Sequence, residues 1–438
     1  MSRISRRDIL KASSLGFILP PWLVHVSHAQ DVSNPTTSIN ADAGSTLVQG
    51  VSSDEIVLGT SAAFTGPSRG LGIELYRGAT SYFQYVNQNG GIHGRKVRLK
   101  LYDDGYQPVP AVTNTMSLML EDEVYALFGY VGTPTVTRVL PLLKKFQDRN
   151  FILFFPFTGA QPQRELPYGD FAFNLRGSYR QETAGLVDNF VATGRKKIAV
   201  FYQADAYGRS GWAGVRAALK RHQLTIAGEA TYRRGTKFTA SMREQAERLL
   251  QYQPDAVVCI GSYAACAAFL RDAVDAKLEV PIANLSFVGS ENLLKLIIDS
   301  QENSRDYTRW LVNSQVVPSY ADLSLASVAQ YRDFMEEFNP AVPDQFAEED
   351  YRVFDKSFVS LEGFLNAKLM TEILKRLDDT PSRSELEQAV FSLDQFDLGI
   401  GEPVSFSATK RQGLDRVYYT TVDGDRFVPL KDWSSAFT

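Results

Sequence analysis

Segments that favour strands and segments that favour helices alternate along most of this chain. In the first part, short apolar strands are predicted at 55–61, 97–101, 124–129 and 151–155. After residue 176 the rhythm repeats, with strands predicted at 197–202, 225–231, 256–260 and 282–287. Strands that alternate with helices build parallel sheets covered by helices, so the sequence predicts an α/β fold with two similar lobes.

The chain is then predicted to return to the first lobe. A strand at 311–317 ends at Pro318, and three helical stretches follow between residues 324 and 392. Short strands close the sequence around the turn Asp423-Gly424-Asp425. The predicted boundaries are 52–176 with 318–400 for the first lobe, and 177–317 with 401–438 for the second.

The first 29 residues have the pattern of an export signal. Arg6 and Arg7 precede an apolar run from Leu15 to Val26, and the small residues of Ser27-His28-Ala29 suit signal peptidase. The adjacent arginines resemble a twin-arginine signal, the alternative being a plain basic tail. We expect residues 1–29 to be removed and the mature chain to be periplasmic. Residues 30–51 lack periodicity and are predicted to be a disordered lead-in.

Composition argues against several classes of protein. The 46 basic and 50 acidic residues give a net charge of -4, so the chain lacks the excess of basic residues that nucleic-acid-binding proteins have. Cys259 and Cys266 are expected to be two buried thiols, although they could pair. Only His93 and His222 lie outside the predicted signal, and no Gly-x-Ser-x-Gly or His-Glu-x-x-His motif occurs. We therefore expect no enzyme activity, no cofactor and no metal.

Ligands of open parallel sheets bind beyond the carboxyl ends of the strands. The loops that follow the predicted strands are 63–67, 103–104, 132–135, 157–160, 203–207, 261–263 and 289–291. Thr133-Pro134 is predicted to start a helix with Thr133 as the N-cap, and such a helix end favours an anion. The alternative is a plain cap with nothing bound. Thr158-Gly159-Ala160 is a similar donor-rich loop.

Five other residues in these loops are weaker candidates. Glu291 could face a ligand ammonium, or it could be solvated or cap a helix. Tyr207 and Tyr263 could line a cleft, or they could lie at the edge of a core. Asp103-Asp104 is a poor metal site and is predicted to cap the following helix and tie the hinge.

The motifs occur in an order that resembles the extracellular substrate-binding proteins of branched-chain amino acid ABC transporters. The segments that carry the likeness are Phe64-Thr65-Gly66-Pro67, Gly78-Ala79, 86–95, Asp103-Asp104, 129–135, Thr158-Gly159-Ala160, Asn174-Leu175-Arg176 and Ala206-Tyr207-Gly208. They span the chain from about Glu55 to Leu430. The resemblance implies a type I periplasmic binding fold: two Rossmann-like lobes with parallel sheets, joined by three hinge strands and closing over a small molecule.

The resemblance also implies roles for individual residues. Thr133 and the loop Thr158-Gly159-Ala160 would hold a ligand carboxylate, and Glu291 would take the α-ammonium. Tyr263 and Tyr207 would line the cleft between the lobes.

The loop at 68–71 would shape the pocket for the ligand side chain. Arg69 and Leu71 in this loop depart from the family pattern, which argues against a simple leucine or valine ligand. The implied partners are an amino acid or amide-like ligand and the permease subunits of an ABC importer, with the chain itself a monomer. A periplasmic sensor that regulates a partner protein is the alternative.

Overall fold

The computed structural model describes residues 49–300, 305–347 and 350–437. The predicted export signal and most of the predicted lead-in lie outside the described residues. Val51 is buried and forms a bridge with Ile56, so the end of the predicted lead-in belongs to the folded unit of the chain. None of the helices in the described part of the chain has the length and apolar character needed to cross a membrane.

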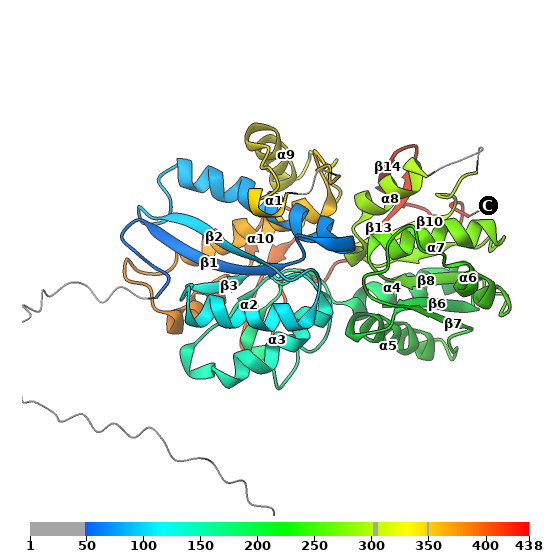
Figure 1. The fold of residues 1–438 in the computed structure, drawn as a ribbon, viewed down its shortest axis with the longest axis horizontal. Coiled ribbons are helices and arrows are strands. Elements are labelled where there is room, and N and C mark those ends of the chain that lie inside the picture. The colour runs from blue at the N-terminus through cyan, green and yellow to red at the C-terminus, as the bar shows by residue number, and fades with distance from the viewer. Residues whose placement is uncertain (1–48, 301–304, 348–349, 438) are drawn as a thin grey trace, which may run out of the picture. The chain divides into compact units, whose positions relative to one another are not determined.

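Five parallel strands form the first sheet, in the order β2-β1-β3-β4-β5. They are β1 (Glu55–Ala62), β2 (Lys96–Asp103), β3 (Ala126–Phe128), β4 (Leu153–Phe154) and β5 (Ala172–Phe173). Helix α1 (Arg69–Gln88) covers one face, and α2 (Pro108–Leu120) and α3 (Thr133–Lys145) cover the other (Figure 1). Most of strand β1 is buried, its polar residues Thr60 and Ser61 included, because both of its faces are covered.

The second sheet has seven strands in the order β14-β13-β10-β9-β8-β6-β7. The parallel ones are β6 (Ile198–Gln203), β7 (Glu229–Tyr232), β8 (Ala256–Ile260), β9 (Ile282–Asn284) and β10 (Leu311–Gln315). Strands β13 (Tyr418–Asp423) and β14 (Arg426–Pro429) add antiparallel pairs at one edge. The covering helices are α4 (Tyr179–Ala192), α5 (Ala206–Arg221), α6 (Arg243–Leu250), α7 (Tyr263–Asp275) and α8 (Ser290–Asp299).

Helix α10 (Phe358–Leu374) returns to the first lobe and packs closely on α1. A Cβ atom on Gly78 would lie 1.7 Å from the carbonyl oxygen of Ser360, and one on Gly363 would lie 2.1 Å from that of Leu75. The remaining elements are α9 (Ala326–Phe338), α11 (Leu386–Phe391), β11 (Phe396–Asp397), β12 (Pro403–Val404) and the 3-10 helices η1 (Gly66–Ser68), η2 (Gln147–Arg149), η3 (Gly169–Phe171), η4 (Ser286–Val288), η5 (Asp344–Phe346) and η6 (Arg383–Glu385).

The chain passes between the two sheets three times: after β5, after β10 and before β13. The first and third passages run side by side and are joined by two backbone hydrogen bonds. The N–H of Asn174 donates to the carbonyl oxygen of Arg411 (2.9 Å), and the N–H of Gly413 donates to the carbonyl oxygen of Asn174 (2.8 Å). The predicted two-lobe α/β fold is therefore confirmed. The exact lobe boundaries stay a prediction, and the small sheet β11-β12 spans the predicted boundary between residues 400 and 401, because Phe396 pairs with Val404.

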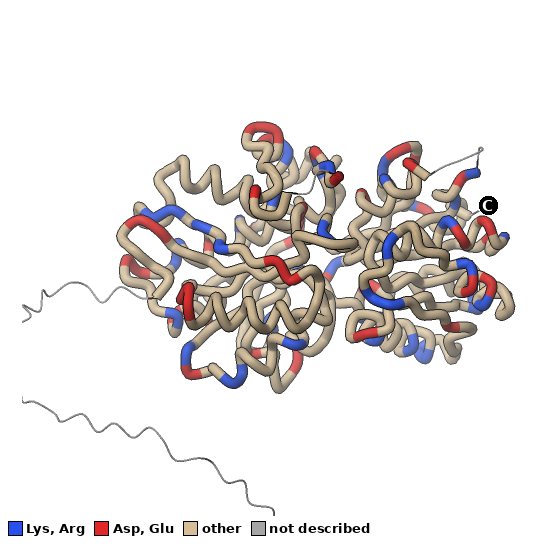
Figure 2. Tube along the Cα trace, viewed as in Figure 1, with Lys and Arg blue, Asp and Glu red and all other residues tan. Residues whose placement is uncertain are grey.

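Two helices of the second lobe, α4 and α8, were not predicted from the sequence. Helix α4 begins with a capping box. The Ser178 side chain accepts from the backbone N–H of Gln181, and the Gln181 side chain accepts from the backbone N–H of Ser178. Basic and acidic residues are interspersed along the trace (Figure 2).

Candidate ligand-binding site

Three buried hydroxyl groups meet at the carboxyl ends of the first sheet. The Thr133 Oγ1 atom lies 2.6 Å from the Thr158 Oγ1 atom and 3.3 Å from the hydroxyl oxygen of Tyr179. Thr133 and Thr158 belong to the first lobe, whereas Tyr179 begins α4 of the second lobe. We call these residues the hydroxyl chain, and it connects the two lobes.

Thr133 is not the N-cap of α3, so that prediction is wrong. Gly132 caps the helix with a φ of 109°, a backbone conformation that glycine adopts readily, and Thr133 is the first helical residue. Its side chain is 1% exposed and faces Thr158 instead of capping its own helix.

The loop Thr158-Gly159-Ala160 lies against the start of α4. The carbonyl oxygen of Gly159 accepts from the N–H of Tyr179 (2.7 Å), and a Cβ atom at position 159 would come within 2.5 Å of the Tyr179 ring. The N–H of Ala160 donates to the Thr158 hydroxyl (3.3 Å). Glycine is thus required where this loop approaches the second lobe.

Aromatic rings from both lobes surround the hydroxyl chain. We call Tyr106, Phe157, Tyr179, Tyr207 and Phe287 the inner ring cluster. All five are buried. The Phe287 ring centre lies 4.7 Å from that of Tyr207, 5.4 Å from that of Phe157 and 5.8 Å from that of Tyr106. Tyr179 and Tyr207 are 5.0 Å apart, so Tyr207 joins the predicted site residues Thr133, Thr158 and Gly159.

Glu291 lies elsewhere, in the first turn of α8. Its Oε1 atom accepts from the N–H of Phe358, the first residue of α10 (3.2 Å), and its Oε2 atom has no hydrogen bond among the described residues. Burial raises the pKa of Glu291 to about 8, partly opposed by the Phe358 N–H. Glu291 lines a cavity of about 480 Å³ together with Tyr320 and the turn before β14. None of its hydrogen bonds in the described structure is to the hydroxyl chain.

Tyr263, Arg69 and Leu71 form a further group at the start of α1. The Tyr263 hydroxyl oxygen accepts from the N–H of Gly70 (3.1 Å), which is another contact between the lobes. Arg69 pairs with Asp350 (2.7 Å), and Leu71 is fully buried. Tyr263 and Arg69 line a cavity of about 520 Å³, whereas the hydroxyl chain does not border it.

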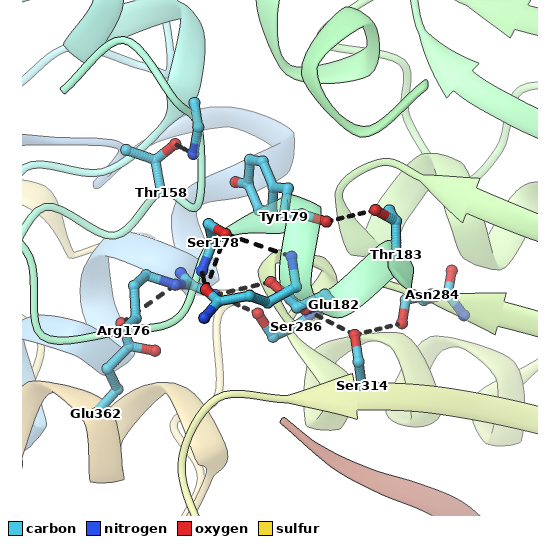
Figure 3. A network of polar contacts seen from close by, with 12 residues as sticks. Thr158, Arg176, Ser178, Tyr179, Glu182, Thr183, Asn284, Ser286, Ser314 and Glu362 are labelled. Atoms are coloured by element: carbon cyan, nitrogen blue, oxygen red, sulfur yellow. Dashed lines mark hydrogen bonds and ion pairs between the residues drawn. The ribbon is translucent and has the colours of Figure 1, made fainter. Parts of the chain in front are cut away.

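A buried charged group lies where the first passage enters the second lobe, and sequence reasoning assigned it no role. We call Arg176, Glu182, Glu362, Ser286 and Ser314 the hinge cluster (Figure 3). The Arg176 Nη2 atom donates to the Ser286 hydroxyl, and the guanidinium forms ion pairs with Glu182 (4.0 Å) and Glu362 (3.6 Å). Burial raises the pKa of Glu362 to about 7, opposed by Arg176.

The prediction that Asp103 and Asp104 cap the next helix is wrong. Gln107 is the N-cap of α2. Asp103 instead accepts from the N–H groups of Phe64 (2.8 Å) and Thr65 (3.1 Å) in the loop after β1. Asp104 accepts from the N–H of Tyr106 (2.8 Å), and burial raises the pKa of Asp104 to about 7. The two carboxylates therefore order the loops beside the inner ring cluster.

The two cysteines are buried and unpaired in the described structure. Within residues 49–300, 305–347 and 350–437, no three His, Cys, Asp or Glu side chains are arranged to hold a metal ion.

A family model described as periplasmic binding protein matches residues 55–426 of the chain. The chain belongs to this family. As a periplasmic binding protein it is similar to the crystal structure of a possible leucine/isoleucine/valine-binding protein from Rhodopirellula baltica, with a TM-score of 0.77 and 30% identity over 90% of this chain and 100% of that one. A Thermus thermophilus branched-chain amino acid transporter protein with bound valine has a TM-score of 0.74 but 16% identity over 88% and 98% of the two chains, which shows the fold alone.

This periplasmic binding protein also matches an amino acid binding protein from Pseudomonas aeruginosa at 27% identity. That alignment covers 38% of this chain and 44% of the relative, so the chain matches less than half of the relative's length.

Proposed function

We propose that this periplasmic binding protein is the substrate-binding component of an ABC importer and binds an amino acid or a related small polar molecule between its lobes. The hydroxyl chain is the observation that carries the proposal, because it joins strand-end loops of the first lobe to α4 of the second. Hydroxyl and backbone N–H groups at such a position suit a ligand carboxylate.

Binding of this kind needs only a few such contacts. Micromolar affinity corresponds to roughly 8 kcal/mol, and hydrogen bonds to a charged group contribute about 1.5 to 3 kcal/mol each. A ligand held by groups of both lobes stabilises the closed arrangement over an open one, and closure is the signal that a permease could recognise. We propose no catalytic step for this site, and we propose that the chain acts as a monomer with permease subunits as partners.

The test of this proposal is ligand binding by the full chain purified from the periplasm. Thermal-shift screening against amino acids, amides, urea and aromatic acids identifies binders, and calorimetry gives their affinities. Thr133→Ala should weaken the best binder at least tenfold, whereas Thr113→Ala, at an exposed position of α2, should not. Glu291→Gln tests the ammonium role separately. Unchanged affinity in Thr133→Ala would remove the assigned site.

Export by the twin-arginine route is also a proposal. Replacement of both Arg6 and Arg7 by lysine should block accumulation in the periplasm. Undiminished accumulation of the double variant in the periplasm would refute export by this route and would leave the proposed ligand binding unaffected.

A further inference from the structure

Strand β2 forms an outer edge of the first sheet, and part of this edge is unpaired. Among the described residues, β2 pairs with β1 and with no other strand. The N–H of Lys96 donates to the carbonyl oxygen of Asp54 (2.7 Å), and the N–H of Asp104 donates to the carbonyl oxygen of Ala62 (2.9 Å). Every second residue of a parallel strand bonds to the same neighbour, so the backbone groups of the even-numbered residues of β2 face β1 and those of the odd-numbered residues face outward.

The outward-facing backbone groups are satisfied at Val97 and open beyond it. The Asn87 side chain accepts from the N–H of Val97 (2.7 Å) and donates to the carbonyl oxygen of Val97 (2.9 Å), as a neighbouring strand would. The N–H and C=O groups of Leu99 and Leu101 have no hydrogen bond in the described part of the chain. Donors and acceptors therefore repeat along this edge at the spacing of a strand, which is the pattern that an added strand pairs with.

A groove of about 780 Å³ runs along the open part of the edge. One side of α1 forms its floor, with Tyr76, Thr80 and Gln84 at successive turns of the helix. The segment 340–346 forms the opposite wall, and it makes no hydrogen bond to β2 in the described structure. Two of its residues are prolines, which lack the N–H that a neighbouring strand would donate. The groove lies wholly in the first lobe and does not border the hydroxyl chain.

The floor of the groove carries two polar atoms that lack partners. Thr80 Oγ1 and Gln84 Oε1 are buried and have no hydrogen bond among the described residues. A buried polar atom without a partner costs free energy, which a donor from a bound molecule would restore. An added strand turns every second side chain toward α1, so hydroxyl side chains at those positions would reach these atoms.

The charged side chains along the groove favour an acidic occupant. Arg98 and Lys100 line it, against one acidic residue in the described lining, Asp344. Arg98 pairs with Glu55 (2.9 Å) and Lys100 with Asp122 (2.9 Å), but the side chains of Arg98 and Lys100 stay 48% and 37% exposed. Exposed pairs of this kind are weak, so both cations can also attract a bound acid. Opposite charges on adjacent strands stabilise their pairing.

We infer that the groove along β2 binds an extended acidic segment of a partner protein, whose backbone pairs with Leu99 and Leu101. The acidic side chains of this segment lie beside Arg98 and Lys100, and its alternate side chains carry hydroxyl groups toward the floor of the groove. A second copy of the chain suits this edge poorly, because pairing of two β2 strands would bring Lys96, Arg98 and Lys100 of both copies together. The site is independent of the ligand proposed between the lobes.

Hydrogen–deuterium exchange of the full chain, resolved to single residues, tests the pairing. The probe is a six-residue peptide of alternating glutamate and threonine, acetylated and amidated at its ends, at millimolar concentration. Exchange of the Leu99 and Leu101 amides should slow at least tenfold, whereas exchange at Val97, which is already bonded to Asn87, should change less than twofold. The same peptide with every backbone nitrogen methylated should give no protection, because it has no N–H groups to donate.

Three results would overturn the inference. Absence of protection at both leucines would remove the pairing, and equal protection by a peptide of alternating lysine and threonine would remove the preference for acids. Protection without any peptide that increases with protein concentration would assign the edge to a second copy of the chain. None of these results bears on ligand binding between the lobes.

Variants of the groove identify the groups responsible. Arg98→Glu should weaken binding of the acidic peptide at least tenfold and strengthen binding of the lysine–threonine peptide, whereas Arg209→Glu, at an exposed position of α5, should change neither. Thr80→Val keeps the shape of the side chain, removes its hydroxyl and should weaken binding of the acidic peptide at least threefold. Wild-type affinity for the acidic peptide in either groove variant would contradict the assignment.

Discussion

Neutralising Glu182 should weaken the connection between the lobes. Its side chain is fully buried in α4, and its Oε2 atom accepts from the N–H of Ser286 (2.7 Å) and from the Ser314 hydroxyl (2.6 Å). Its Oε1 atom forms the ion pair with Arg176. Glu182→Gln keeps the shape and one acceptor but removes the charge, so Arg176 is left with Glu362 as its only carboxylate partner in the cluster.

The size of the effect follows from these contacts. Hydrogen bonds to a charged acceptor contribute about 1 kcal/mol more than neutral ones, and loss of one partner of a buried ion pair costs roughly 3 to 5 kcal/mol. Because Gln retains an acceptor and Glu362 stays, we expect a loss of about 3 to 4 kcal/mol. At roughly 2.1 cal/mol/K of unfolding entropy per residue, the roughly 390 residues of the folded unit should then lose about 4 to 5 °C in Tm.

Differential scanning calorimetry of the unliganded full chain measures this shift. The matched control is Asp188→Asn on the same helix, whose carboxylate is half exposed and pairs with Arg221 (3.0 Å) and His222 (2.6 Å). Exposed pairs contribute less than about 1 kcal/mol, so the control should change Tm by about 1 °C. Equal shifts in the two variants, or no shift in Glu182→Gln, would refute the role given to the hinge cluster.

Three further predictions concern packing, protonation and thiol chemistry. Gly78→Ala should destabilise the fold by several kcal/mol because its Cβ would meet a carbonyl oxygen of α10 at 1.7 Å, while Gly177→Ala, whose nearest contact is 3.6 Å, should move Tm by about 1 °C at most. Burial raises the pKa of Glu291 from 4.5 to about 8. The protonated carboxyl group therefore stabilises the folded state fully below about pH 4.5, and this contribution is lost as the pH rises through about 8. The Tm of Glu291→Gln should therefore fall less than that of the wild type between about pH 5 and 8.5, and parallel profiles would contradict this. Burial also raises the pKa of the Cys259 thiol, so a thiol reagent should label Cys259 and Cys266 only after unfolding, and unfolded, unreduced protein that titrates fewer than two thiols would show a disulfide.

The sequence pattern predicts the strands well because buried parallel strands are short, continuous apolar runs. Strand β8 has the predicted bounds, Ala256–Ile260. Strand β7 begins at Glu229, four residues later than predicted, although the backbone of Ala227 and Gly228 already forms hydrogen bonds with β6. The spacing of apolar residues shows which face of a strand is apolar, but it says little about the residue at which the strand begins to pair with its neighbour.

The candidate site was predictable in part, for a geometrical reason. Thr133 and Thr158 follow strands of the same sheet, so their meeting follows from topology. Tyr179 follows a passage between the lobes, and only the capping box at Ser178 and Gln181 marked its position. The direction of the Glu291 side chain depends on the 3-10 turn before α8, which residue spacing does not specify.

A crystal structure of the full chain with its strongest binder from the amino acid and aromatic acid panel tests the central claim most directly. The account predicts density for the ligand between the lobes, with an oxygen atom within hydrogen-bond distance of the Thr133 and Thr158 hydroxyls. Ligand density confined to the cavity beside Glu291 or to the outer surface of one lobe would contradict it.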